Sequence, residues 1–305
     1  MSPPITIIGA GAIGLYLGAH LSRVTQVSLV ARGPRAEALA EHGFELAGSD
    51  SGRFNLPVAS LEAGLDLDPE AIVLVATKAT DLEKLVGPLA TALAPGQIVG
   101  LLQNGLGVHK FVRHYLPNAT LVRATCWVGV TLELGHRAVV AGAPLFEMGA
   151  DQPEAAATLT DVFNAANLRA RAGHTVAEVE WRKALLNLAV SGICTIVDER
   201  NGAILESPEL RAMVEDVLAE ALPVATAEGV DLGPEDVERV FTAIANTRAN
   251  WNAMLQDMRR ARPTEMPYLN AAVDRLARRH GLTAPVNATV ARFVTHLAGR
   301  ARTAT

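Results

Sequence analysis

Cysteine is almost absent from this sequence. The two cysteines, Cys126 and Cys194, lie far apart and form no C-x-x-C pair. This excludes a disulfide framework and a zinc ribbon, so we expect a reducing, cytoplasmic setting. The histidines show no ligand pattern either, because His109, His114 and His136 have neither an H-x-x-H nor an H-E-x-x-H spacing. We therefore expect no metal site.

Long runs of apolar or basic residues are also lacking. No apolar segment reaches about 18 residues without being interrupted by a charged residue, so no membrane-spanning helix is expected. The net charge is −5 and no long run of lysines and arginines is present, which argues against nucleic-acid or anionic membrane partners. The apolar stretch from Ile5 is broken by glycines and has no basic residues before it, so a signal peptide is not expected. These absences leave small molecules as the expected partners.

Apolar residues are plentiful, at 50% of 305 residues, which is enough for two folded domains. Short apolar segments alternate with helical patterns in the first half of the chain, an arrangement typical of a parallel sheet covered by helices on both faces. The strands of this pattern are predicted at residues 5–8, 26–30, 71–76 and 97–102, with further strands within 120–148.

The character of the sequence changes after Gly173. Long amphipathic stretches, such as residues 176–190 and 209–228, dominate from there on, and strand patterns vanish. We therefore predict an α/β protein with an N-terminal Rossmann doubly wound domain at residues 1–174. An all-helical domain is predicted to follow at residues 175–305.

A glycine-rich turn follows the first predicted strand and opens the first predicted helix. It has the form G-x-G-x-x-G, in which the glycines permit a tight turn, the approach of a pyrophosphate and close helix packing. The N–H groups at the helix start would then face the anion. A glycine turn that binds nothing is the alternative. The cofactor-binding residues predicted here are Gly9, Ala10, Gly11, Ala12, Ile13 and Gly14.

Arg32 stands at the end of the second predicted strand. NAD enzymes usually place a carboxylate there, on the 2′-hydroxyl of the ribose, whereas a guanidinium can pair with the 2′-phosphate of NADP. Arg32 therefore favours NADPH as the cofactor. The alternative is a solvated surface arginine.

Two further polar residues follow later strands, at the edge where ligands bind in open α/β sheets. Lys78 is predicted to balance phosphate charge of the cofactor, and Asn104 to hold the nicotinamide ribose or the substrate. Taken alone, each fits a surface lysine or a turn asparagine equally well.

The second half of the chain offers a candidate proton donor. Reduction of a ketone by hydride produces an alkoxide, which needs a nearby proton donor and positive charge. Lys183 and Asn187 are four residues apart on one amphipathic helix and therefore share a face. Without further context, a salt-bridging lysine would explain Lys183 as well.

Four separated motifs together make the chain resemble the ketopantoate reductase (2-dehydropantoate 2-reductase) family along nearly its whole length. They are followed by M-L-Q-D at residues 254–257 and T-E at residues 264–265. The four motifs, in order, are G-A-G-A-I-G from Gly9, T-K-A from Thr77, Q-N-G from Gln103 and W-R-K-x-x-x-N from Trp181.

This resemblance implies reduction of ketopantoate to pantoate by NADPH, a step of pantothenate synthesis. It implies that Lys183 is the general acid and that Glu265 binds a substrate hydroxyl. Asn104 and Asn187 would position the substrate and the nicotinamide, while Arg32 and Lys78 would bind phosphates of NADPH. The expected partner is then a small 2-oxo acid substrate. A homodimer is the expected alternative to a monomer.

Three positions depart from the family pattern on the substrate side. Ser191 replaces a common second asparagine, Ala253 replaces a serine before M-L-Q-D, and Pro267 replaces an acidic residue. Ser191 and Asn250 are kept as candidate substrate-binding residues, with Asn252 as another possible substitute. Two alternatives follow: a pocket rebuilt for another 2-oxo acid, or a noncatalytic NADPH-binding sensor.

Overall fold

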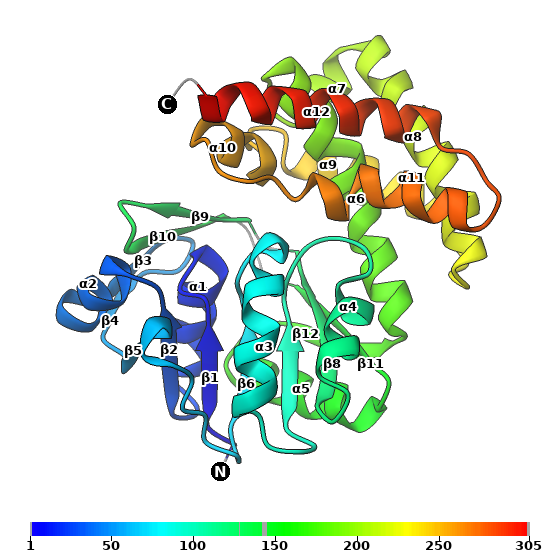
Figure 1. The fold of residues 1–305 in the computed structure, drawn as a ribbon. Coiled ribbons are helices and arrows are strands. Elements are labelled where there is room, and N and C mark those ends of the chain that lie inside the picture. Colours follow the sequence, from blue (N-terminus) through cyan, green and yellow to red (C-terminus); the bar gives the residue numbers. More distant parts are fainter. Residues whose placement is uncertain (1, 128, 142–144, 304–305) are drawn as a thin grey trace. The chain divides into compact units, whose positions relative to one another are not determined.

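The computed structural model of the protein describes residues 2–127, 129–141 and 145–303 (Figure 1). The chain divides into two compact units. The first, here called the sheet unit, comprises residues 1–103 and 108–179, and the second, the helical unit, comprises residues 104–107 and 180–305. Residue 174, the predicted end of the first domain, is the last residue of a strand, and the next helix begins at Val176.

Eight strands in the described part of the chain form the main sheet, in the order β5-β2-β1-β6-β7-β8-β11-β12. Neighbouring strands are parallel except for the antiparallel pair β8 and β11. The first six follow the 3-2-1-4-5-6 order of dinucleotide-binding sheets. The predicted Rossmann class is therefore confirmed. The strands are β1 (Ile5–Ile8), β2 (Val27–Ala31), β5 (Val58–Ser60), β6 (Ile72–Val75), β7 (Ile98–Leu101), β8 (Thr120–Cys126), β11 (Phe146–Ala150) and β12 (Ala170–His174).

Helices cover both faces of this sheet. The chain runs through α1 (Ala12–Leu21) and α3 (Leu82–Ala92) in opposite directions across the sheet, so right-handed crossovers place these helices on opposite faces. Helix α3 packs against α4 (Val108–Tyr115), and α5 (Pro153–Ala165) packs against β8, β11 and β12. All residues of β1 and β6 are buried, as expected for parallel strands covered on both faces.

A second, smaller sheet was not predicted, although two of its strands, β9 and β10, lie within residues 120–148, where further strands were expected. Its order is β4-β3-β10-β9, and three of its strands pack against α1. Strands between residues 44 and 60 were missed because they are short and lack a continuous apolar run. The bounds are β3 (Phe44–Gly48), β4 (Gly52–Phe54), β9 (Gly129–Glu133) and β10 (Arg137–Ala141), with α2 (Pro34–His42) preceding β3.

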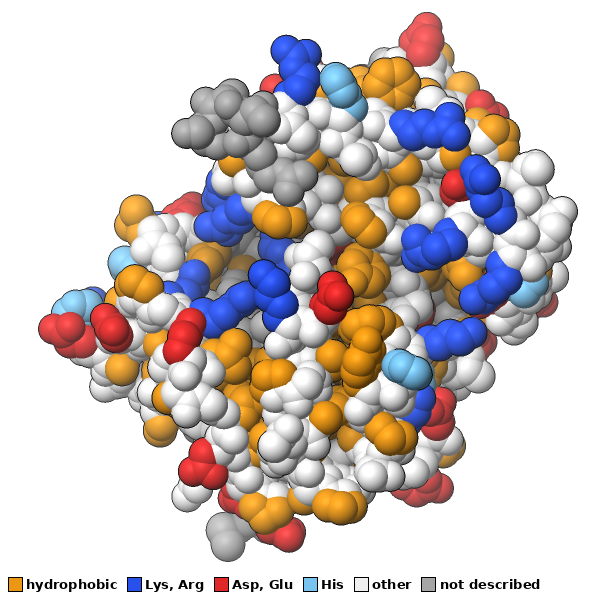
Figure 2. Space-filling model, in the orientation of Figure 1, with side chains coloured by type: hydrophobic (Ala, Val, Ile, Leu, Met, Phe, Trp, Pro, Cys, Tyr) orange, Lys and Arg blue, Asp and Glu red, His pale blue; other side chains and the backbone are white. Residues whose placement is uncertain are grey.

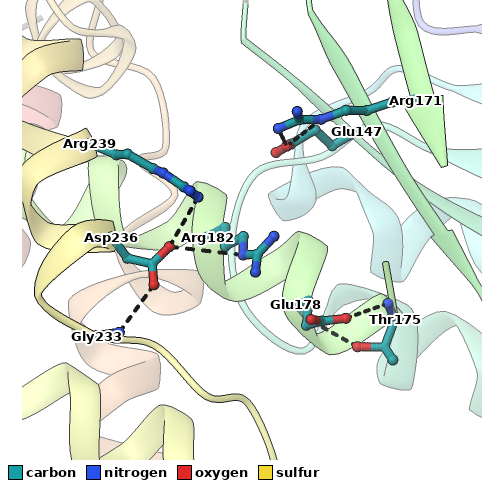
Figure 3. Close-up of polar contacts among 8 residues, drawn as sticks. All are labelled: Glu147, Arg171, Thr175, Glu178, Arg182, Gly233, Asp236 and Arg239. Carbon is teal, nitrogen blue, oxygen red and sulfur yellow. Dashed lines mark hydrogen bonds and ion pairs between the residues drawn. The ribbon is translucent and has the colours of Figure 1, made fainter. Parts of the chain in front are cut away.

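Helices make up the helical unit, as the predicted fold class requires. The first helix, α6, begins within the last residues of the sheet unit and continues into the helical unit. It starts with a capping box, in which Thr175 N–H donates to Glu178 at 2.8 Å and Glu178 N–H donates to the Thr175 hydroxyl at 3.2 Å (Figure 3). The elements are α6 (Val176–Val197), α7 (Ala203–Glu206), α8 (Pro208–Ala227), α9 (Pro234–Asn246), α10 (Ala253–Arg259), η3 (Met266–Tyr268), α11 (Asn270–Arg279) and α12 (Pro285–Thr303).

A buried amide network joins three of these helices. Asn270 on α11 donates to Asn287 on α12 at 3.0 Å, and Asn287 donates to the Val217 carbonyl of α8 at 3.0 Å. Glu220, also on α8, accepts the N–H of Asn287 at 2.9 Å. Both asparagines are fully buried, so these hydrogen bonds fix how the helices pack.

The surface carries charges of both signs with apolar side chains between them, as Figure 2 shows for one face. Large apolar side chains that are exposed in the described residues come from separate elements, an ordinary distribution. They are Tyr115, Leu134, Val197, Leu205, Met213 and Phe293. None of the helices in the described part of the chain combines the length and apolar character needed to cross a membrane.

Candidate active site

The glycine turn lies at the carboxyl end of β1, and its three glycines differ in how much space a side chain would have. Gly9 has φ of 111°, and a Cβ added there would lie 2.7 Å from the backbone nitrogen of Thr77. A Cβ on Gly14 would lie 1.9 Å from the Gly9 carbonyl oxygen. A Cβ on Gly11 would meet nothing within 4 Å. Gly9 and Gly14 are thus required by packing, whereas the space beside Gly11 is open to a ligand.

The start of α1 has the properties of an anion site. Gly11 is the N-cap residue, no side chain caps the helix, and no acidic residue lies in its first turn. The N–H groups of Ala12, Ile13 and Gly14 precede the first intrahelical hydrogen bond, which Leu15 makes to Gly11 at 3.0 Å. These donors and the open space beside Gly11 fit the pyrophosphate of a dinucleotide.

Arg32, directly after β2, lies close to an acidic residue that the sequence reasoning missed. Its guanidinium is 2.7 Å from the carboxylate of Asp81, at the end of the short helix η2 (Ala79–Asp81). Both side chains are partly exposed. The arginine thus already has an anionic partner of its own chain.

A second acidic residue lies beside Arg32. The two carboxylate oxygens of Glu62 accept the Gly33 N–H at 3.1 and 3.2 Å, and one accepts the Ser60 hydroxyl at 2.6 Å. The Ser60 hydrogen bond, the Gly33 N–H and the charge of Arg32 lower the pKa of Glu62. Glu62 belongs to the short helix η1 (Leu61–Ala63), and no motif in the sequence indicated it.

Gln103 connects the ends of β6 and β7. Its side-chain amide donates to the Val75 carbonyl at 2.8 Å and to the Thr77 carbonyl at 3.1 Å. The fully buried Arg123 donates to the Leu101 carbonyl at 2.8 Å and also to the Gln103 carbonyl. These bonds fix the backbone on either side of the predicted ligand residues. Lys78, one of them, is half-buried and precedes η2.

Asn104 and the three residues after it belong to the helical unit. The Asn104 amide donates to the carboxylate of Glu265 at 3.2 Å. Leu106 N–H donates to the Tyr268 carbonyl at 2.8 Å. Gly105 has φ of 104°, and a Cβ there would lie 2.5 Å from the Tyr268 Cβ. The structure therefore brings together two predicted substrate residues that are far apart in the sequence.

Helix α6 carries the candidate proton donor in a row with two polar residues. Lys183, Asn187 and Ser191 are spaced by four and so share one face. Lys183 and Asn187 are half-buried, and Ser191 is buried. Within the described part of the chain, the buried Asn187 Nδ2 has no hydrogen-bond partner. An unused buried donor of this kind is available to a ligand.

A cluster of charged residues around Asp236 lies beside α6. The buried Asp236 accepts the Gly233 N–H at 3.1 Å, and its carboxylate lies 4.0 Å from Arg182 and 3.5 Å from Arg239 (Figure 3). The Arg182 guanidinium thus lies on the side of α6 that faces Asp236 of α9. Because successive helix residues differ by about 100°, Lys183 must point elsewhere.

The two asparagines considered as substitutes have different surroundings. The backbone of Asn250 forms two hydrogen bonds. Its N–H donates to the Thr247 carbonyl at 2.8 Å, and its carbonyl accepts the Asn201 N–H at 3.0 Å. Asn252 caps α10, because its side-chain oxygen accepts the Leu255 N–H at 2.9 Å. Its Nδ2 is buried without a partner among the described residues. The described contacts therefore join neither asparagine to Lys183 or Glu265.

Comparison with known proteins gives consistent matches over both units. A family model described as Ketopantoate reductase PanE/ApbA matches residues 5–152, and one described as Ketopantoate reductase PanE/ApbA C terminal matches residues 175–298. The 2-dehydropantoate 2-reductase of Pyrococcus abyssi is 29% identical over 292 residues, covering 93% of this chain and 94% of that protein. The enzyme of the same name from Streptococcus pyogenes serotype M3 is 27% identical, covering 92% and 93%.

Solved structures agree with this fold over almost the whole chain. A D-mandelate dehydrogenase with NADH and anilino(oxo)acetate has a TM-score of 0.91 at 24% identity, covering 98% of this chain and 99% of that one. A PanE/ApbA family ketopantoate reductase from Ralstonia eutropha JMP134 has a TM-score of 0.89 at 24% identity, with the same coverage. At these identities the structural likeness concerns the fold alone.

Proposed function

Because this chain belongs to the ketopantoate reductase family, we propose that it reduces 2-dehydropantoate to pantoate with NADPH. The reaction is an oxidoreductase reaction on a CH-OH group, as the family indicates, and would serve pantothenate synthesis. The observation that carries the proposal is the hydrogen bond of 3.2 Å between Asn104 and Glu265. It orients the carboxylate that would recognise a hydroxyl of the substrate.

The sheet unit would hold NADPH, which supplies the hydride when bound. The N–H groups at the start of α1 would bind the pyrophosphate beside Gly11. Arg32 would pair with the 2′-phosphate, and Lys78 would balance further phosphate charge. The open space beside Gly11 and the absence of acidic residues in the first turn of α1 support this assignment.

The helical unit would supply the groups that act on the substrate. Lys183 would donate a proton from Nζ to the keto oxygen as the hydride reaches the keto carbon, which yields the hydroxyl of pantoate. Its positive charge would stabilise the negative charge that develops on that oxygen. A proton from solvent would then restore the ammonium group.

Substrate positioning would involve the remaining candidates. Glu265, oriented by Asn104, would accept a hydrogen bond from the substrate hydroxyl. Asn187 Nδ2, which has no hydrogen-bond partner among the described residues, would donate to the 2-oxo acid group. Ser191 would add a hydroxyl on the same face of α6. Asn250 would contribute from the loop between α9 and α10.

One observation favours a second candidate, a reductase of a different 2-oxo acid. The side-chain oxygen of Asn252 is engaged in the cap of α10, and the next residue is Ala253, where the family commonly has serine. A lost hydrogen bond to a charged group costs about 1.5 to 3 kcal/mol, unless another group replaces it. Such a change would shift preference toward a more apolar 2-oxo acid.

The test is the oxidation of NADPH, followed by absorbance, with 2-dehydropantoate and a panel of other 2-oxo acids. The panel includes the 2-oxo acid of mandelate, because a D-mandelate dehydrogenase shares this fold. Lys183→Ala should lower kcat by about 10² to 10⁴ with the nucleotide affinity unchanged. Lys84→Ala, an exposed lysine of α3, is the matched control.

The outcomes separate the candidates. Efficient turnover of 2-dehydropantoate, lost in Lys183→Ala alone, supports the proposal. A preference for another 2-oxo acid supports a rebuilt pocket. Nucleotide binding without turnover of any panel member would contradict a reductase function and favour a sensor.

A further inference from the structure

Two carboxylates compete for the groups that would recognise a 2′-phosphate. Arg32 is paired with Asp81 at 2.7 Å, and the Gly33 N–H is taken by Glu62 at 3.1 and 3.2 Å. Gly33 is the N-cap residue of α2, so its N–H and the start of that helix favour an anion. In this chain the anion is already supplied by Glu62.

The position of Glu62 follows from the sheet. Strand β5 pairs with β2, and Ser60 lies opposite Ala31, the last residue of β2. Glu62 follows two residues later and therefore lies beside Arg32 and Gly33. The end of β2 is where Rossmann enzymes distinguish the 2′-hydroxyl from the 2′-phosphate. Glu62 thus lies where the two nucleotides differ.

The carboxylate of Glu62 is held in place rather than free to move away. The Ser60 hydroxyl donates to it at 2.6 Å, in addition to the Gly33 N–H. These bonds also lower its pKa, so the group is ionised at neutral pH. A dianionic phosphate placed here would have to displace a fixed negative charge.

We propose that Glu62 is a specificity-determining residue that reduces the preference of this protein for NADPH over NADH. The inference rests on the proposed function, because it assumes that a nicotinamide nucleotide binds beside Gly11. Glu62 repels a 2′-phosphate and occupies the Gly33 N–H that would otherwise bind it. The same carboxylate can accept a hydrogen bond from the 2′-hydroxyl of NADH. Arg32 and Glu62 therefore act in opposite directions on the choice of nucleotide.

The proposal differs from a purely structural role for Glu62. If Glu62 only fixed the turn after β5, its replacement would alter stability or the affinities for both nucleotides alike. A specificity role alters the ratio of the two affinities. It also depends on ionic strength, since exposed charges are screened by salt.

The experiment measures the Kd of NADPH and of NADH by isothermal titration calorimetry, without substrate. Glu62→Gln removes the charge and keeps the size of the side chain. It should raise the affinity for NADPH relative to NADH by about fivefold at low salt, with a smaller shift at about 1 M salt. Ser60→Ala, which releases the carboxylate, should shift the ratio in the same direction by a smaller factor. Glu70→Gln, an exposed acid just before β6 at the other end of the strands, is the matched control.

The results distinguish this inference from the proposed function. If the wild type binds both nucleotides and Glu62→Gln changes the ratio of their affinities by less than about twofold, the specificity role of Glu62 is overturned. The proposed function is then unaffected. If the wild type bound neither nucleotide, the proposed function would fail and the inference with it. Thermal melting of each variant shows that the comparison is made between folded proteins.

Discussion

The guanidinium of Arg32 lies 2.7 Å from the carboxylate of Asp81, although β1 separates the strands that precede these two residues. The ion pair thus links the segments that follow β2 and β6, the two strands on either side of β1. It lies at the carboxyl ends of these strands, where the glycine turn also begins. Both partners are partly exposed, so the pair contributes only about 0 to 1 kcal/mol. A phosphate that binds Arg32 can therefore replace Asp81 at little cost.

The first prediction concerns Arg32 itself. Arg32→Ala should weaken NADPH binding by about tenfold, because one charge-assisted interaction at a partly exposed site is lost. The affinity for NADH, which lacks the 2′-phosphate, should change by less than about twofold. Titration calorimetry with both nucleotides measures this. Arg53→Ala, an exposed arginine of β4, controls for the general loss of positive charge, and an equal loss for both nucleotides would contradict the assignment.

The second prediction separates two glycines of one motif. Gly14→Ala should destabilise the sheet unit by about 1 to 3 kcal/mol or more, because the added Cβ would lie 1.9 Å from the Gly9 carbonyl oxygen. Gly11→Ala should leave the melting temperature nearly unchanged, since nothing lies within 4 Å of its added Cβ. It should instead weaken nucleotide binding, because the methyl group fills the space for the pyrophosphate. Melting curves and nucleotide titrations of both variants test this, and equal melting temperatures would refute it.

The sequence predicted those parts of the molecule that depend on local pattern. The buried β-branched strand Ile5–Ile8, the glycine turn after it and the switch to helices after residue 174 all follow from nearby residues. The short strands β3, β4, β5 and β12 were missed because their apolar runs are too brief to stand out. They are stabilised by pairing with distant strands instead.

In the candidate site, too, local motifs were predicted from the sequence, whereas contacts between distant residues were not. The motifs identified Asn104 and Glu265 separately, but only the fold shows that they are hydrogen-bonded. Asp81 and Glu62 were missed because each becomes relevant through contact with Arg32 or Gly33, which the sheet order creates. Charged residues of this kind look like ordinary surface acids in the sequence. Their role depends on which strands are neighbours.

The third prediction tests the pair Asn104 and Glu265. Glu265→Gln should raise the KM for 2-dehydropantoate by about ten- to a hundredfold, because the carboxylate proposed to accept a hydrogen bond from the substrate hydroxyl becomes a neutral amide. The KM for 3,3-dimethyl-2-oxobutanoate, which differs from 2-dehydropantoate only by the absence of that hydroxyl, should change by less than about threefold. Steady-state kinetics with both acids measure the difference. Glu238→Gln, an exposed acid of α9, is the control, and equal effects on both substrates would rule out hydroxyl recognition by Glu265.

The fourth prediction concerns His20, which is buried in α1. Its Nε2 lies 2.6 Å from Asp50, and its Nδ1 lies 3.3 Å from the Ala166 carbonyl oxygen. Burial lowers the pKa of His20 and outweighs the opposing effects of the Ala166 carbonyl and Asp50. The folded chain therefore takes up this proton at a lower pH than the unfolded chain does.

The direction of the pH dependence follows from this difference. At pH values well above about 6.5, the ordinary pKa of histidine, His20 is neutral in both states and contributes no slope. As the pH falls below that value, the unfolded chain binds the proton first, so the free energy of unfolding decreases. Melting temperatures between about pH 7.5 and about pH 5.5 should therefore fall less steeply in His20→Gln than in the wild type. His42→Gln, an exposed histidine of α2, should keep the wild-type slope, and an unchanged slope in His20→Gln would show that folding does not lower the pKa of His20.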